Sequence, residues 1–361
     1  MEQYEQTPVR VNEDALDVRS QAAYDHKRYP NKWLAMVGAA GMVLVTTLIV
    51  EILSLVSGGN INAWFRTEFG ADMFSAILSQ FFGVLMIPLI LLTIAKKDLL
   101  ATARLKKNIN AVQVLLLVLG SVFLFMPSQM FNSLIVTGLE QVMGPASDVQ
   151  MSDATNISQL LFELVIVAGL PAICEELFFR GMVMRAFERI GAVAAVVLSS
   201  VVFAIMHGNF QQFGYAFLLG LFLGTVTMLS DSLLAGSVIH FTMNAISVIL
   251  SYPPIYTEYE RIATEQAEFV SMFSFFLCPL AVAGIAVLFV FCTRKRNQQL
   301  YGKKTVGVIA YPEEMPKQKG GLKALYVIAW IAFVVINIGQ ALTLWYYDAL
   351  MEMLENLQGM V

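Results

Sequence analysis

The chain has 361 residues, of which 57% are hydrophobic and only 14% are charged, against roughly 25% charged residues in soluble domains. Several apolar runs approach the roughly 20 residues that cross a bilayer, so the sequence predicts an all-α, polytopic membrane bundle. The net charge of −4 gives no basic footprint, which excludes nucleic acid as a partner and leaves the lipid bilayer as the expected surroundings.

A polar tail, residues 1–33, precedes a series of apolar segments in the chain. Nine spans are expected, at about Trp33–Val56, Met73–Ala95, Ala111–Phe131, Ile157 to beyond Glu176, Ala192–His207, Phe213–Leu229, Leu233–Leu250, Phe269–Cys292 and Leu322–Trp345. The segments Asn132–Asn156 and Ser251–Glu268 are predicted to be loops, and an acidic tail follows Trp345. The count is eight if the seventh or the last segment is not a span.

Lysine and arginine are concentrated in three polar segments: the N-terminal tail, Lys96–Asn110 and Arg294–Lys323. Positive charge favours the cytoplasmic side, so these segments and the N-terminus are predicted to be cytoplasmic. The two acidic loops then fall on the opposite side, and nine crossings satisfy every assignment.

Two carboxylates and a guanidinium follow the fourth apolar run, at Glu175, Glu176 and Arg180. Each such charge costs about 2.5–3.5 kcal/mol at a helix centre, so ionisable residues there are functional candidates. On a helix, Glu176 and Arg180 share a face, while Glu175 is turned about 100° away. One carboxylate can therefore be held by the arginine while the other points elsewhere.

Two of the three histidines lie in predicted spans, His207 at the end of the fifth and His240 in the seventh. Asn244 follows His240 by four residues, so both side chains lie on one helix face. At about 1.5 Å rise per residue, Glu175, His207 and His240 all fall near the middle of the bilayer. Three helices can therefore converge on one polar site.

These residue types admit two chemistries. A carboxylate such as Glu175 and an imidazole such as His207 can position and deprotonate water, while His240 and Asn244 offer N–H donors to a developing oxyanion. This set would hydrolyse an amide without a covalent intermediate. Alternatively, Glu175, His207 and His240 could hold a zinc ion with water in the fourth position, which leaves Glu176 as a spare base.

Three ordered motifs within about residues 155–250 resemble a known family. They are Glu175-Glu176-x-x-x-Arg180, Phe203-x-x-x-His207 and His240-x-x-x-Asn244. The pattern is similar to that of the CPBP family, which comprises type II CAAX prenyl proteases and bacteriocin-processing-like membrane proteases and is also called Abi.

The resemblance implies an all-helical membrane fold with its site open toward the cytoplasm. It also implies that Glu175 and His207 activate water, that His240 and Asn244 bind the oxyanion, and that Glu176 and Arg180 belong to the catalytic site. The substrate would be a membrane-associated or lipid-modified peptide or protein. The family is classed as metalloprotease or glutamate-dependent protease, so zinc stays the alternative to a mechanism that needs no cofactor.

The sequence therefore favours an integral endopeptidase of a bacterial plasma membrane. The expected divisions are a cytoplasmic tail (1–33), N-terminal membrane helices (34–150), a CPBP-like catalytic core (151–252) and C-terminal helices with a basic loop (253–361). The rival functions are a non-catalytic immunity or scaffold member of the family and an ion or solute transporter. Transporters commonly show internal repeats, and this sequence has none that we detect.

Overall fold

Every regular element in the described part of the chain is a helix. The computed structural model describes residues 29–57, 65, 67–105, 109–147, 153–301 and 323–358. Eight helical stretches there are long and apolar enough to cross a membrane. The first four are α2 (Lys32–Val56), α4–η2–α5 (Glu68–Leu78, Ser79–Leu85, Met86–Ile94), α7 (Ala111–Met143) and α8–η3–α9–η4–α10 (Ile157–Glu163, Leu164–Gly169, Leu170–Phe178, Phe179–Val183, Met184–Phe187). The others are α12 (Phe210–Ser230), α13 (Leu233–Ser251), α15–η6–α16 (Ala267–Met272, Phe273–Leu277, Cys278–Tyr301) and α17 (Lys323–Trp345). The predicted all-α membrane bundle is confirmed, and the protein is an integral membrane protein.

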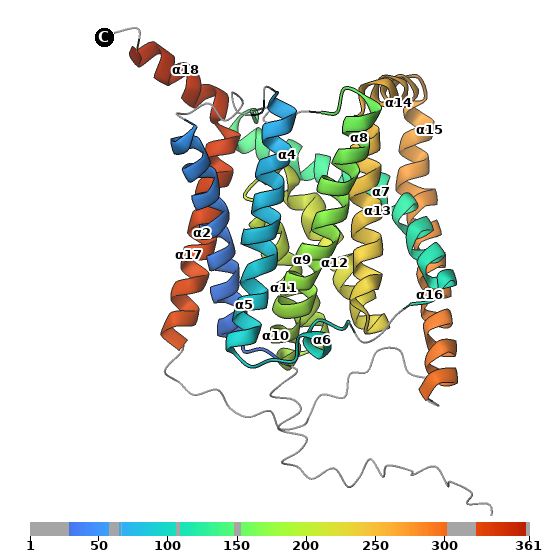
Figure 1. The fold of residues 1–361 in the computed structure, drawn as a ribbon. Coiled ribbons are helices and arrows are strands. Elements are labelled where there is room, and N and C mark those ends of the chain that lie inside the picture. Colours follow the sequence, from blue (N-terminus) through green and yellow to red (C-terminus); the bar gives the residue numbers. More distant parts are fainter. Residues whose placement is uncertain are drawn as a thin grey trace, which may run out of the picture.

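Contacts between the connecting segments place them at two opposite ends of the bundle (Figure 1). Arg104 pairs with Glu188 and Asp231, so the connections around these residues share one end, here called the proximal end. At the other, distal end, the Ser147 N–H donates to the Trp345 carbonyl. Counting the short helix α11 (Ala192–Met206), the described chain therefore passes along the bundle nine times, as the sequence predicts.

Helix α11 is much shorter than its neighbours. Its 15 residues extend only about 22 Å, less than the roughly 30 Å thickness of a bilayer core. Gly191 and Gly208, with φ of +121° and +55°, bound it in conformations that favour glycine. Because α11 starts at the proximal end, the residue that caps it, His207, stays inside the bundle.

Three segments that were expected to be loops or a tail are partly helical. The apolar run that predicts each span is shorter than the helix that contains it or is followed by a separate polar helix. Helix α7 continues through residues 132–143 of the expected loop and ends only at Gly144, whose φ is +85°. Most of the other expected loop forms the exposed helix α14 (Pro253–Glu265), which has proline at its first position, a favoured start. The acidic tail forms α18 (Tyr347–Gln358).

The helices of residues 151–252 share their hydrophobic packing with the helices on either side of them in the sequence. One core joins α2 and α17 to α9, α10 and α11, and a second joins α7, α12, α13 and α16. Helices α11 and α12 lie close together at Gly220, where an added β-carbon would lie 2.9 Å from the Ser200 side chain. Small residues permit such close helix contacts in membranes. No observation divides the chain at residues 34, 151 or 253, so these boundaries stay predictions.

Candidate active site

Glu176 and Arg180 form a fully enclosed ion pair within one membrane helix. Arg180 Nη1 lies 2.9 Å from Glu176 Oε1, and neither side chain has any exposed surface. The guanidinium also donates to the Gly220 carbonyl at 3.2 Å and lies 4.6 Å from the centre of the Phe203 ring. Burial without these partners would cost several kcal/mol per ion, so each contact offsets part of the cost of enclosing the pair.

His240 approaches the same carboxylate from α13. Its Nδ1 lies 2.9 Å from Glu176 Oε1. Gly236, one turn earlier on α13, provides the space: a β-carbon there would lie only 2.7 Å from Glu176 Oε2. Glu176 is thus enclosed by one arginine, one histidine and one glycine.

Glu175 has different surroundings from its neighbour. Its Oε1 accepts a hydrogen bond of 2.7 Å from Gln80 Nε2 on η2. Its Oε2 lies 3.8 Å from His240 Nε2, beyond hydrogen-bond distance. His240 therefore stands between the two carboxylates, bonded to one and near the other.

His207 reaches this group through an aromatic ring rather than directly. Its ring lies 4.9 Å, centre to centre, from that of Phe203, and the Phe203 ring lies 5.8 Å from that of His240. His207 Nδ1 is 2.8 Å from the Phe203 carbonyl oxygen. Among the described residues, no hydrogen bond or ion pair joins His207 to Glu175, so water or substrate would have to connect them.

Asn244 is oriented by a backbone carbonyl one turn before a proline. Pro171 has no N–H, so it cannot form the α-helical bond to Val167, four residues earlier. Asn244 Nδ2 donates to that Val167 carbonyl instead, at 3.2 Å. An amide nitrogen has two hydrogens, so one N–H of Asn244 remains for another acceptor.

The described residues do not form a zinc-binding group of side chains. Within the described ranges, no three histidine, cysteine or acidic side chains are grouped so that they could hold a metal ion. The Nδ1 bonds of His240 to Glu176 and of His207 to a backbone carbonyl leave Nε2 of each ring available, as in metal-binding histidines, so they do not exclude zinc. The fit fails on position alone, because Glu175, His207 and His240 are not grouped around one point in the described residues.

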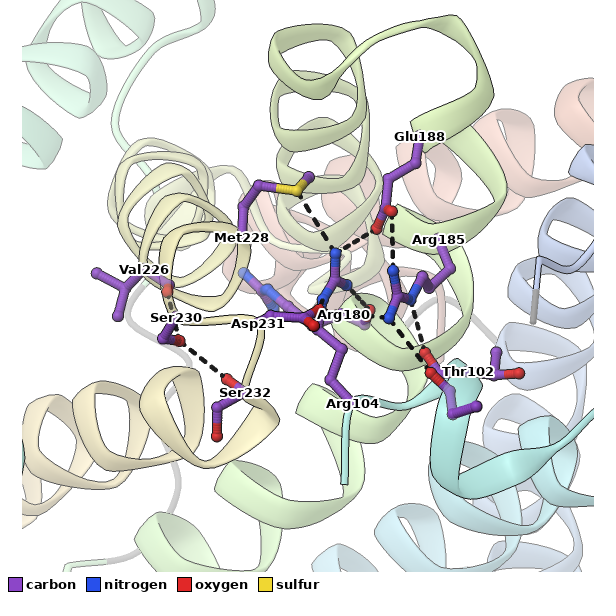
Figure 2. Close-up of polar contacts among 11 residues, drawn as sticks. Thr102, Arg104, Arg180, Arg185, Glu188, Val226, Met228, Ser230, Asp231 and Ser232 are labelled. Atoms are coloured by element: carbon purple, nitrogen blue, oxygen red, sulfur yellow. Dashed lines mark hydrogen bonds and ion pairs between the residues drawn. The ribbon is translucent and has the colours of Figure 1, made fainter. Parts of the chain in front are cut away.

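A buried cluster of charges lies at the proximal end of the bundle (Figure 2). Arg104 binds Glu188 at 2.6 Å and Asp231 at 3.0 Å, and Arg185 binds Glu188 at 3.0 Å. Each of the four residues is at most 7% exposed. Arg185 also donates to the Thr102 carbonyl at 2.9 Å. The two arginines and two acids thus link three connections at the proximal end: the one that contains Arg104, the one at Glu188 and the one at Asp231.

Sequence reasoning missed Gln80 and Arg104. Gln80 lies outside the three motifs, and a single glutamine in an apolar span was the only signal. Arg104 was interpreted as a cytoplasmic charge in a loop, whereas its guanidinium is buried. Burial alone would lower its pKa, but Glu188 and Asp231 outweigh this and raise it, so Arg104 stays charged.

Three π-helical segments surround the site. Segment η2 contains Gln80, η3 contains Val167, and η4 contains Arg180. Such segments insert one extra residue into a helical turn and frequently occur at functional sites. Each of these three segments supplies a group that binds a motif residue.

The comparisons with known proteins agree with the motifs. Residues 157–246, about a quarter of the chain, match the model of the type II CAAX prenyl endopeptidase Rce1-like family. No curated protein and no solved structure matches the chain. The matched segment includes all three motifs, and the family match supports a CAAX-protease-like intramembrane endopeptidase. Residues 157–246 are therefore similar to the type II CAAX prenyl endopeptidase family, which supports assignment of this segment to the CPBP family.

Proposed function

We propose that the chain hydrolyses a peptide bond of a membrane-associated substrate, with water activated by Glu175 and His207. The observation that carries the proposal is the unequal treatment of two adjacent carboxylates. Glu176 Oε1 contacts both the guanidinium of Arg180 and Nδ1 of His240, and this side chain is fully buried, whereas Glu175 accepts from the neutral amide of Gln80 and is 6% exposed. Pairs of acids with different surroundings commonly divide structural and acid–base work between them.

His207 is oriented to serve the same water. Its Nδ1 must carry the hydrogen to bond with the Phe203 carbonyl, so in the neutral ring Nε2 is an acceptor. In the proposed reaction, the water oxygen adds to the substrate carbonyl carbon while Glu175 takes the water proton. That proton then passes to the leaving amine as the carbon–nitrogen bond breaks.

His240 and Asn244 would stabilise the oxyanion that forms. Because Nδ1 of His240 donates to Glu176, Nε2 can also donate only when the ring carries both protons. A doubly protonated His240 would balance the site, since two carboxylates would then face two cations. Charges removed from water are stable only when paired in this way. The unused N–H of Asn244 would supply the second donor.

The proposal extends to substrate and orientation. A peptide of a membrane protein or a lipid-modified peptide is the expected substrate, and a bacterial plasma membrane with the proximal end in the cytoplasm is the expected setting. The family match supports the first expectation, and the basic segments support the second.

Purified protein incubated with membrane-anchored and prenylated peptides, with and without a chelator, tests the proposal. Cleavage that the chelator leaves unchanged would support direct activation of water. Stoichiometric metal in the wild type that disappears in His240→Ala, but not in Asn244→Ala, would overturn the metal-free mechanism. Failure of the wild type to cleave any peptide faster than Glu175→Gln would favour a non-catalytic role.

A further inference from the structure

Gln80 is a polar residue in the second membrane span, outside the segment 157–246 that matches the family. Its amide nitrogen lies 2.7 Å from Glu175 Oε1, although the two residues are 95 positions apart. A carboxylate can only accept when ionised, so the glutamine must present its N–H group to it. The bond therefore favours the charged, acceptor form of Glu175.

The helix that carries Gln80 is fixed against its neighbour. Gly83, three residues later in η2, faces Thr46 of α2 so closely that a β-carbon would overlap the threonine methyl. Segment η2 packs against both α2 and α9. The extra residue in its π-helical turn changes which side chains face α9. Gln80 is thus held by a rigid contact rather than by a mobile loop.

The hydrogen bond from Gln80 gives the two carboxylate oxygens of Glu175 different surroundings. Oε1 is occupied by Gln80, which leaves Oε2 on the side of His240, 3.8 Å from its Nε2. The carbonyl oxygen of Gln80 is buried and has no hydrogen-bond partner in the part of the chain that the structure describes. A buried polar group without a partner is unfavourable, so the position of Gln80 is not explained by stability alone.

We propose that Gln80 is a positioning residue, which holds one oxygen of Glu175 so that the other faces the reacting water. This inference rests on the proposed function. A side chain that fixes a catalytic group can matter greatly, because misplacement by about 1 Å can slow a reaction by about 10²-fold. The residue acts through Glu175 and does not itself touch the reacting atoms.

Gln80→Met tests the role, because methionine has a similar length and lacks the N–H. We expect kcat to fall by about 10- to 100-fold with KM within about twofold, since the change affects geometry in the reaction step. Gln113→Met is the matched control: Gln113 also donates Nε2 to an oxygen between two spans, at 2.9 Å from Thr293 Oγ1. The control should keep its kcat even if its stability falls.

A double-mutant cycle on thermal unfolding provides a readout that does not need activity. The changes Gln80→Met and Glu175→Met, each of which removes one partner of the bond, are combined, and the shifts in Tm are compared. A direct bond predicts that the double variant shows a smaller shift than the sum of the single shifts. If Gln80→Met does not fold, Gln80→Asn replaces it, because its amide is one methylene too short for the 2.7 Å bond.

Additive shifts, or an unchanged kcat in Gln80→Met of an active enzyme, would overturn the role of Gln80 and leave the proposed function intact. A non-additive cycle in a wild type that cleaves nothing would instead reject the proposed function while the Gln80–Glu175 contact stands.

Discussion

At the scale of single residues, a rotation of about 100° along one helix gives two neighbouring glutamates different surroundings. Glu176 turns toward Arg180 and the space left by Gly236, and Glu175 turns toward Gln80. The same chemical group is therefore neutralised at one position and left available at the next. His240 links the two, because one ring nitrogen faces each carboxylate.

Asn244→Ala tests the oxyanion assignment. If its free N–H acts only in the transition state, kcat and kcat/KM should fall together by roughly 10²–10³-fold while KM stays nearly constant. Steady-state kinetics under conditions where chemistry limits turnover measures this. A raised KM with unchanged kcat would show instead that Asn244 holds the substrate.

At the scale of helices, contacts within one helix could be predicted, whereas contacts between helices could not. The Glu176–Arg180 pair follows from a four-residue spacing on a helix, and the structure has it at 2.9 Å. The partner of Glu175 lies on another span, and no local pattern indicates that Gln80 reaches it. The π-helical turns were also unexpected, because they depend on packing as well as on sequence.

The positions of helix ends were also only partly predictable from the sequence. Hydropathy predicts where a segment leaves the bilayer core, but helix α7 continues past Pro127 and Gly138 and ends only at Gly144, whose φ is positive. Arg104 was expected in water on charge alone, and only the fold brings Glu188 and Asp231 beside it. The burial of Arg104 therefore depends on tertiary contacts, which amino-acid composition does not predict.

The charge cluster of Arg104, Arg185, Glu188 and Asp231 predicts a large effect on stability. Arg104→Leu would leave two buried carboxylates short of a partner, and breaking a buried pair costs about 3–5 kcal/mol. We expect a marked fall in Tm in detergent. Arg104→Lys should recover only part of the loss, because an ammonium cannot reproduce the two-sided contact of a guanidinium.

Arg261→Leu is the matched control for that change. Arg261 also contacts two acids, Glu258 and Glu265, but on the exposed helix α14. Exposed pairs contribute little to stability because water screens them. A fall in Tm as large as that of Arg104→Leu would show that the number of ion pairs, rather than their burial, determines stability.

At the scale of the whole molecule, nine passes along the bundle bring the N-terminal, central and C-terminal helices of the described chain into shared cores. The proximal end gathers the connections that contain Arg104, Glu188 and Asp231 (Figure 2). The basic segments Lys96–Asn110 and Arg294–Lys323, the second of which lies largely outside the described residues, predict that this end is cytoplasmic.

Single-cysteine labelling tests that orientation. In a background without the three native cysteines, cysteines placed at Lys303 and at Glu258 should behave oppositely in intact cells. An impermeant maleimide should label the residue-258 position on exposed α14 and leave the residue-303 position unlabelled until the cells are opened. Labelling of residue 303 alone from outside would reverse the topology.

The most direct test of the central claim compares Glu175→Gln, His207→Ala and Cys174→Ala with the wild type on one cleaved peptide. The account predicts that the first two variants fold, insert and lose turnover, because neither group alone can orient and deprotonate water. Cys174→Ala should stay nearly as active as the wild type, since this side chain is only 1% exposed and packs in the core. Retention of more than about a tenth of the activity by Glu175→Gln or His207→Ala would contradict the account, since general acid–base catalysis typically contributes about 10²–10⁴-fold.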